Sequence, residues 1–298
     1  MNETIVTFWL FVLVLLGTWC SFRKCRQILQ KHTQDDRTAE YRLTDRLFIL
    51  LAFGTAGVFL FRIFMVHQSW RPLTSHVDGL TLLVSLLCPT LIYLEKRGNA
   101  RGVSFIGYPG VTFLLLWALC ASRWTFRAFT PDTMMKVVHL FAVYMGTLAV
   151  FISALYGGTY LFSERRLKRK ENLGQSKQFA SLETLERMIV VSSAVGFTFI
   201  SLGLVTGLVS ISALHEKMPS GWWHSPKIIL AFAVWVIYAL LFNVRHTIFF
   251  RGSRAAWLSL LGLLLLIMTF GAVHTFSSQF PTSSPFDTPT KQSSEVDG

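Results

Sequence analysis

The sequence predicts an all-α integral membrane protein with eight transmembrane helices and both termini on the extracytoplasmic side. Composition is the first observation behind this prediction. Of 298 residues, 52% are hydrophobic and only 15% are charged, with a mean hydropathy of +0.48, whereas soluble domains carry roughly 25% charged residues. The second observation is a series of eight long apolar stretches, and the third is an uneven distribution of Lys and Arg between the segments that join them.

Each apolar stretch approaches or exceeds the roughly 20 residues that a helix needs to cross the bilayer core. A helix is the expected form because backbone polar groups must be satisfied internally where water is absent. In chain order the stretches are Ile5–Phe22, Leu47–Trp70, Gly79–Leu94, Gly102–Ser122, Val137–Ser163, Met188–Leu214, Ile228–Val244 and Ala255–Phe276.

The two ends of the chain differ in character. A signal peptide is the alternative for the first stretch, but its charges follow the apolar run, so we expect a retained helix. Residues 277–298 are rich in Ser, Pro and Thr. We therefore expect a membrane domain over residues 1–276, which is followed by a disordered extracytoplasmic tail.

The basic residues predict the orientation. Of the 28 Lys and Arg, 20 fall in the connections after the first, third, fifth and seventh stretches. Cytoplasmic loops carry such an excess, so these connections should face the cytoplasm of a cell (inner) membrane. The same distribution explains most of the net charge of +12. We therefore read the basic runs as topology anchors and expect no nucleic acid partner.

With this orientation, six of the eight histidines map to the outer ends of helices or to outer loops: His67, His76, His139, His215, His224 and His274. Any one of them has a simple alternative explanation as an interfacial polar residue, since imidazole costs less there than at the midplane. Six on one side nevertheless make that side the candidate for a binding site.

The outer connection at residues 215–227 has the sequence HEKMPSGWWHSPK. Trp222 and Trp223 are also consistent with an interfacial aromatic belt. Together with His224 and Lys227, however, they would provide a flat apolar surface with a cation at its edge. Such a surface suits a large planar anion, and haem is one, with two propionates and an iron that takes axial imidazoles.

Two histidines are candidate axial ligands. His139 lies at the outer start of the fifth stretch, and His274 lies at the outer end of the eighth. A pair at one depth on different helices could hold an iron from both sides. Arg123 and Arg127, which follow the fourth stretch, are candidate propionate partners, with interfacial anchoring as the alternative.

The second half of the chain, from His139 to Ser278, resembles the cytochrome c assembly proteins of the CcsA/ResC type and their HemX-like and YpjD-like relatives. A weaker resemblance runs through the second and third apolar stretches. The resemblance rests on an ordered series of segments: YLFSERRLKRK, SLETLERM, GFTFISLGLVTG, WWHSPK, WVIYALLFNVR, RGSRAAWLSLLG and GAVHTF. The family resemblance implies a tryptophan-rich haem loop at Gly221 to Lys227, flanked by two outer axial histidines, which correspond to His139 and His274 here.

The sequence also departs from the family pattern. His224 and Ser225 stand where the loop pattern has Trp-Asp, and Asn243 stands where a membrane histidine is expected. The inner histidine pair of the full haem lyases is therefore incomplete. The resemblance is closest to the shorter HemX-like and YpjD-like members, which favours binding of haem over a lyase activity.

We therefore expect a membrane protein of cytochrome c assembly that binds or presents haem b at the outer face. Its partners would be a cytochrome c synthesis complex and apocytochrome c. We expect no enzymatic activity, since the chain has no P-loop, HExxH or GxSxG motif. A related membrane transporter or efflux accessory without haem is the alternative, and a b-type cytochrome in electron transfer is a second one.

Three further features carry structural predictions. Gly203 and Gly207 form a GxxxG motif, which indicates close helix packing inside the bundle or, alternatively, dimerisation. Arg62 lies within the second stretch and should pair with a polar group, pair with a propionate, or extend to the surface. The segment SLETLER at residues 181–187 predicts a capped helix entry.

Overall fold

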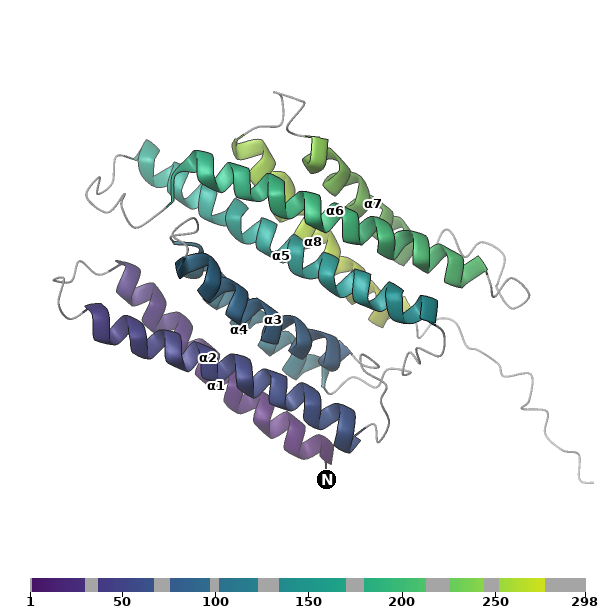
Figure 1. The fold of residues 1–298 in the computed structure, drawn as a ribbon, viewed down its shortest axis with the longest axis horizontal. Helices are drawn as coiled ribbons and strands as arrows, with labels where there is room; N and C mark the ends of the chain where they lie inside the picture. Colours follow the sequence, from purple (N-terminus) through teal and green to yellow (C-terminus); the bar gives the residue numbers. More distant parts are fainter. Residues whose placement is uncertain are drawn as a thin grey trace, which may run out of the picture.

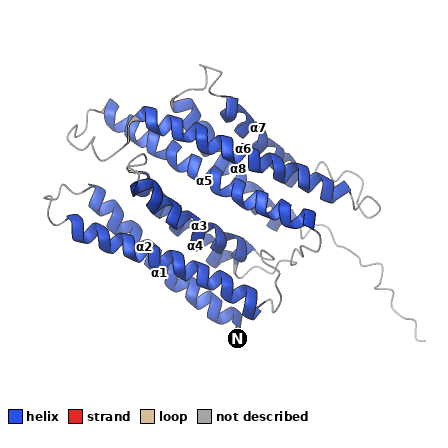
Figure 2. Ribbon diagram, in the orientation of Figure 1, coloured by secondary structure: helices blue, strands red, loops and turns tan. Residues whose placement is uncertain are grey.

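The computed structural model describes residues 2–29, 37–66, 76–96, 102–122, 134–169, 180–212, 226–243 and 252–276. Over these residues the chain is helical apart from short turns at the helix ends (Figure 2). The predicted all-α class is therefore confirmed. Of the predicted tail, residues 277–298, nothing falls within the described part of the chain.

Each predicted apolar stretch corresponds to one helix. The helices are α1 (Asn2–Leu29), α2 (Arg37–Phe61) with its π-helical continuation η1 (Arg62–Val66), α3 (His76–Lys96), α4 (Val103–Ala121), α5 (Met134–Lys168), α6 (Leu182–Ser212), α7 (Pro226–Asn243) and α8 (Ser253–Phe276). In the described residues, six of them are long and apolar enough to span a membrane, and the apolar parts of α7 and α8 are shorter. The protein is thus a multi-pass membrane protein, and the count of eight spans remains a prediction.

The bundle consists of two four-helix halves, α1–α4 and α5–α8 (Figure 1). In the first half α1 packs on α2 and α4, and α3 packs on the same two helices. In the second half α5 packs on α6 and α8, and α7 packs on the same two. The halves meet where α5 contacts α3 and α4.

Successive helices run in opposite directions. The start of α1, the start of α5 and the end of α8 therefore lie toward the same end of the bundle (Figure 1). We call this the His139 end, because His139 lies in the second turn of α5. Its assignment to the extracytoplasmic side remains a prediction from the charge distribution.

The glycines of α5 allow close contact with its neighbours. At Gly157 an added Cβ would meet Ser259 Oγ and would lie 2.9 Å from the carbonyl oxygen of Ala256, so only glycine lets the α5 and α8 backbones approach this closely. Gly146 plays the same part toward α6, where an added Cβ would lie 3.3 Å from the backbone nitrogen of Ile200. One face of α5 is thus shared by α6 and α8.

Replacing Gly157 with valine should therefore destabilise the second half. Forcing extra atoms into a packed helix contact typically costs about 1–3 kcal/mol. We expect a lower midpoint of thermal unfolding in detergent for Gly157→Val. Gly57→Val is the matched control, because an added Cβ at Gly57 would meet nothing within 4 Å. Equal midpoints for the two variants would contradict this packing of α5 on α8.

Helix α6 confirms two of the motif predictions. At its start the Ser181 hydroxyl oxygen accepts a hydrogen bond from the Thr184 backbone N–H at 3.2 Å, which is the expected N-cap. Near its other end Gly203 and Gly207 face α5. An added Cβ would lie 3.3 Å from Val143 at position 203 and 2.9 Å from His139 at position 207. The GxxxG motif therefore packs inside the bundle.

Charged side chains join the helices of the first half at two places, one toward each end. Away from the His139 end, the fully buried Lys24 ammonium lies 2.9 Å from Glu95 Oε1 and 3.5 Å from Asp45 Oδ1, so it joins α1, α3 and α2. Toward the His139 end, Arg62 Nε donates to Asp78 Oδ1 at 2.6 Å, with 4% and 0% of the two side chains exposed. Of the alternatives predicted for Arg62, the structure thus shows pairing with a polar partner.

Candidate functional site

His139 lies on the face of α5 that meets α6, and one hydrogen bond fixes its ring. Its Nδ1 atom is 2.8 Å from the carbonyl oxygen of Gly203. A carbonyl only accepts hydrogen bonds, so Nδ1 carries the proton and donates it. The neutral imidazole then has its lone pair on Nε2. Metal-binding histidines commonly donate their other ring N–H to a backbone carbonyl in this way, which orients the ring and sets the tautomer.

The ring rests against one stretch of α6, which we call the His139 seat: Gly203, Thr206 and Gly207. The Thr206 hydroxyl lies 3.5 Å from Nδ1 and donates to the Leu202 carbonyl at 2.7 Å. At position 207 an added Cβ would lie 2.9 Å from His139 Cε1, so the absence of a side chain makes room for the imidazole. The GxxxG motif thus packs against the candidate ligand His139 as well as against the α5 backbone.

The antiparallel packing of α5 and α8 brings His274 to the level of His139. Gly157 faces Ala256, and one turn further along α5 the Tyr160 hydroxyl lies 3.1 Å from the Cβ position of Gly252. From the Gly157–Ala256 contact, His139 is 18 residues back along α5 and His274 is 18 residues forward along α8. Each step is about five full turns. The two positions therefore lie at a similar level along the bundle.

The remaining predicted site residues belong to segments that begin or end at the His139 end. Trp222, Trp223 and His224 lie in the connection between α6 and α7, and Arg123 and Arg127 lie in the connection between α4 and α5; all five are outside the described residues. Lys227 is the second residue of α7. For Lys227 and His274 the structure describes the helix backbone, not the side chain. The helix ends that bound both connections nevertheless lie at the same end of the bundle as the His139 seat (Figure 1).

The sequence matches a known protein family. Residues 4–279 match the family described as cytochrome C assembly protein. The chain belongs to this family. The match covers both halves of the bundle, so it includes α1–α4 as well as the second half, which carries most of the motifs.

Individual relatives support the same membership. The chain is 21% identical to the cytochrome c biogenesis protein CcsA of Guillardia theta, over 70% of this chain and 75% of that protein. It is 24% identical to the protein of the same name in Prochlorococcus marinus, over 71% and 72%. A shorter match to CcsA of Atropa belladonna is 30% identical over 27% and 25% of the two chains. No solved structure matches the chain significantly.

The sequence predicted His139 but not its seat. The pattern at residues 203–207 indicates packing without saying which helix is packed. A histidine one turn into the fifth stretch and a GxxxG motif near the end of the sixth are, however, compatible with an antiparallel helix pair. That spacing is the signal from which the seat could have been inferred.

Proposed function

We propose that this protein takes part in cytochrome c assembly by holding haem at the extracytoplasmic face between His139 and His274. The observation that carries the proposal is the hydrogen bond from His139 Nδ1 to the Gly203 carbonyl, which leaves Nε2 as the nitrogen able to ligate iron. The register of α5 and α8 supports His274 as the second ligand. Ligation by two imidazoles would fill both axial positions of the haem iron and limit access of oxygen while haem is held.

The other residues of the proposed site would bind and orient the haem. Trp222 and Trp223 would stack on the apolar face of the macrocycle, with His224 beside them. Lys227, Arg123 and Arg127 would pair with the propionates, as charge-assisted hydrogen bonds are strong when water is excluded. Haem enters here as cargo, and its acceptor would be an apocytochrome c with a reduced CxxCH motif. On this proposal the chain presents haem and does not itself catalyse attachment.

The proposal is tested by absorbance of the detergent-solubilised protein after expression with sufficient haem. We expect haem to co-purify and to give the low-spin spectrum of bis-imidazole ligation. In the organism, loss of the protein should lower the level of mature cytochromes c. Purification without haem, together with normal cytochrome c levels and altered ion or metabolite export in the deletion strain, would instead support the transporter or efflux alternative.

The seat of His139 gives a further prediction. Gly207→Ala adds a methyl group that would crowd the imidazole, with 2.9 Å to Cε1, so the ring must turn away from its position. We expect haem retention to fall roughly tenfold, as for loss of an outer-shell contact to a metal ligand. Gly196→Ala is the matched control on the same helix, since its added Cβ would make an ordinary contact, 3.5 Å from Ala149. Equal haem content in both variants would count against the role of the seat.

A further inference from the structure

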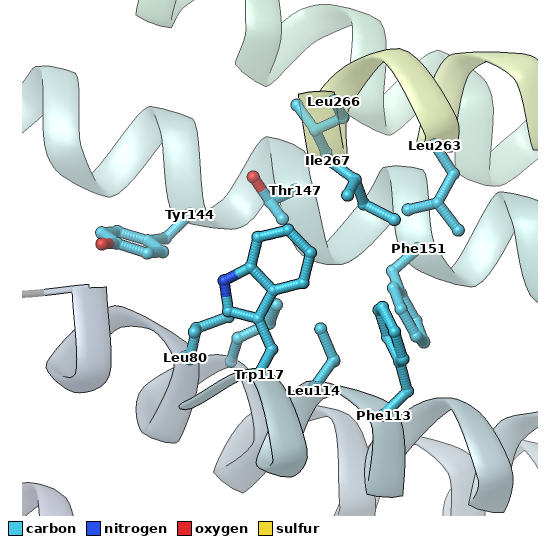
Figure 3. Close-up of a pocket in the computed structure, with 11 residues that line it drawn as sticks. Leu80, Phe113, Leu114, Trp117, Tyr144, Thr147, Phe151, Leu263, Leu266 and Ile267 are labelled. Carbon is cyan, nitrogen blue, oxygen red and sulfur yellow. The ribbon is translucent and has the colours of Figure 1, made fainter. Parts of the chain in front are cut away.

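A cavity lies between the two halves of the bundle, separate from the His139 seat (Figure 3). It contains about 570 Å³ of empty space, a figure that includes the space on its open side. Leu80 of α3 and Trp117 of α4 line one wall, and Thr147 and Phe151 of α5 with Leu263 of α8 line the opposite one. Each of these lining residues belongs to the apolar part of its helix, so the cavity lies within the apolar part of the bundle.

The polar groups of the lining are few. The Thr147 hydroxyl donates to the Val143 carbonyl at 2.7 Å. The Tyr144 ring lies against Gly79 of α3. The indole nitrogen of Trp117 is on the side of its ring toward Tyr144, within the cavity (Figure 3). Among the described residues no acceptor for this N–H is present. The lining therefore offers an apolar wall with few polar groups, among them the Trp117 indole N–H and the Tyr144 hydroxyl.

This lining argues for hydrocarbon inside the cavity. A water molecule needs two to four polar partners, so an apolar cavity of this kind stays dry. Protein interiors are close-packed, and an unfilled apolar cleft between helices would forfeit van der Waals contacts along its walls. The cavity opens between membrane-spanning helices, so lipid chains are the molecules that reach it in the bilayer.

The position of Trp117 indicates which part of a lipid it meets. Trp117 is four residues before the end of α4 at Ala121, or about 6 Å along the helix axis. Leu80 is likewise four residues after the start of α3 at His76. Both therefore lie near the membrane boundary at the His139 end, where tryptophan N–H groups meet the interfacial region of the bilayer.

We propose that this cavity binds one acyl chain of a phospholipid from the leaflet at the His139 end. The chain lies between α3–α4 and α5–α8, and the Trp117 N–H donates to its ester carbonyl. The bound lipid completes the packing between halves that meet mainly where α5 contacts α3 and α4. This inference does not depend on haem binding.

Fluorescence quenching by phospholipids with brominated acyl chains tests the site. The lipid is titrated into the full-length protein in mild detergent, for the wild type, Trp117→Phe and Trp257→Phe. The difference between the wild type and each variant isolates one indole. Trp257 is the control, because it lies on the outside of α8 with 56% of its surface exposed. We expect Trp117 to be quenched at a several-fold lower ratio of lipid to protein than Trp257. Quenching of both at the same ratio would overturn the proposal.

Native mass spectrometry with a cavity-filling variant gives a second, independent test. Leu263→Phe should occupy part of the cavity and lower the retained phospholipid several-fold relative to the wild type. Leu264→Phe makes the same change one residue away, where 51% of the side chain is exposed, and should retain wild-type lipid. Unchanged retention in Leu263→Phe, with a native circular dichroism spectrum, would overturn the proposal. A bound mass that is not a phospholipid would do so as well.

Discussion

His139→Ala should remove nearly all haem from the purified protein, with a loss of more than about tenfold relative to the wild type. Outer-shell changes around a metal ligand already cost about 10–100-fold in affinity, and this variant deletes a ligand itself. The measurement is the ratio of haem absorbance to protein after purification in detergent.

A second measurement separates loss of the ligand from misfolding of the His139→Ala variant. The alanine variant leaves a space the size of an imidazole beside Gly207, so added imidazole should restore part of the low-spin spectrum. His76→Ala is the matched control, as His76 begins α3 in the other half of the bundle, toward the same end. It should retain wild-type haem. A normal haem content in His139→Ala would refute the proposed ligand.

His274→Ala tests the register of α5 and α8. Since both axial ligands act on one iron, each single variant should lose most of the haem and the double variant should lose little more. Such non-additivity is expected of groups that act as a unit. If His274→Ala retained haem while His139→Ala did not, the second ligand would have to come from elsewhere. His224 in the connection between α6 and α7 would then be the first residue to test.

The sequence predicted the helices well because the bilayer leaves few alternatives. In the bilayer core, where water is absent, the backbone must form helices long enough to cross it. The position of each helix can therefore be predicted from an apolar stretch such as Ile5–Phe22. The same physics concentrated the histidines at helix ends and made His139 a candidate. The hydrogen bond from His139 to Gly203 could not be predicted from the sequence. The two residues are 64 positions apart, and only the register of α5 on α6 brings them together.

Asp78 shows a second limit of the sequence. It precedes the predicted stretch Gly79–Leu94, where an acidic residue is expected to face water. In the structure α3 begins two residues earlier, at His76, and Asp78 is fully buried in its first turn beside Arg62. Hydropathy gives the cost of each charge singly. Hydropathy does not indicate whether two charged side chains meet, because that depends on how η1 packs on α3.

The Arg62–Asp78 pair should be the most sensitive point for stability. Asp78→Asn removes the carboxylate charge that faces Arg62 and leaves the guanidinium buried without it. Breaking a buried ion pair from one side typically costs about 3–5 kcal/mol, because the desolvation penalty of the remaining charge is no longer offset. We expect a clear drop in the midpoint of thermal or detergent-induced unfolding for Asp78→Asn, and for Arg62→Met.

The double variant Arg62→Met with Asp78→Leu separates this cause from a general loss of packing. With both charges gone there is no uncompensated ion, and replacing a buried pair by apolar side chains is often neutral or stabilising. The double variant should therefore be more stable than Asp78→Asn. The exposed pair of Lys168 and Glu164, 2.7 Å apart on α5, is the matched control, and Lys168→Ala should cost only about 0.3–0.5 kcal/mol. Equal losses for the buried and exposed pairs would show that the Arg62–Asp78 contact does not hold α2 and η1 to α3.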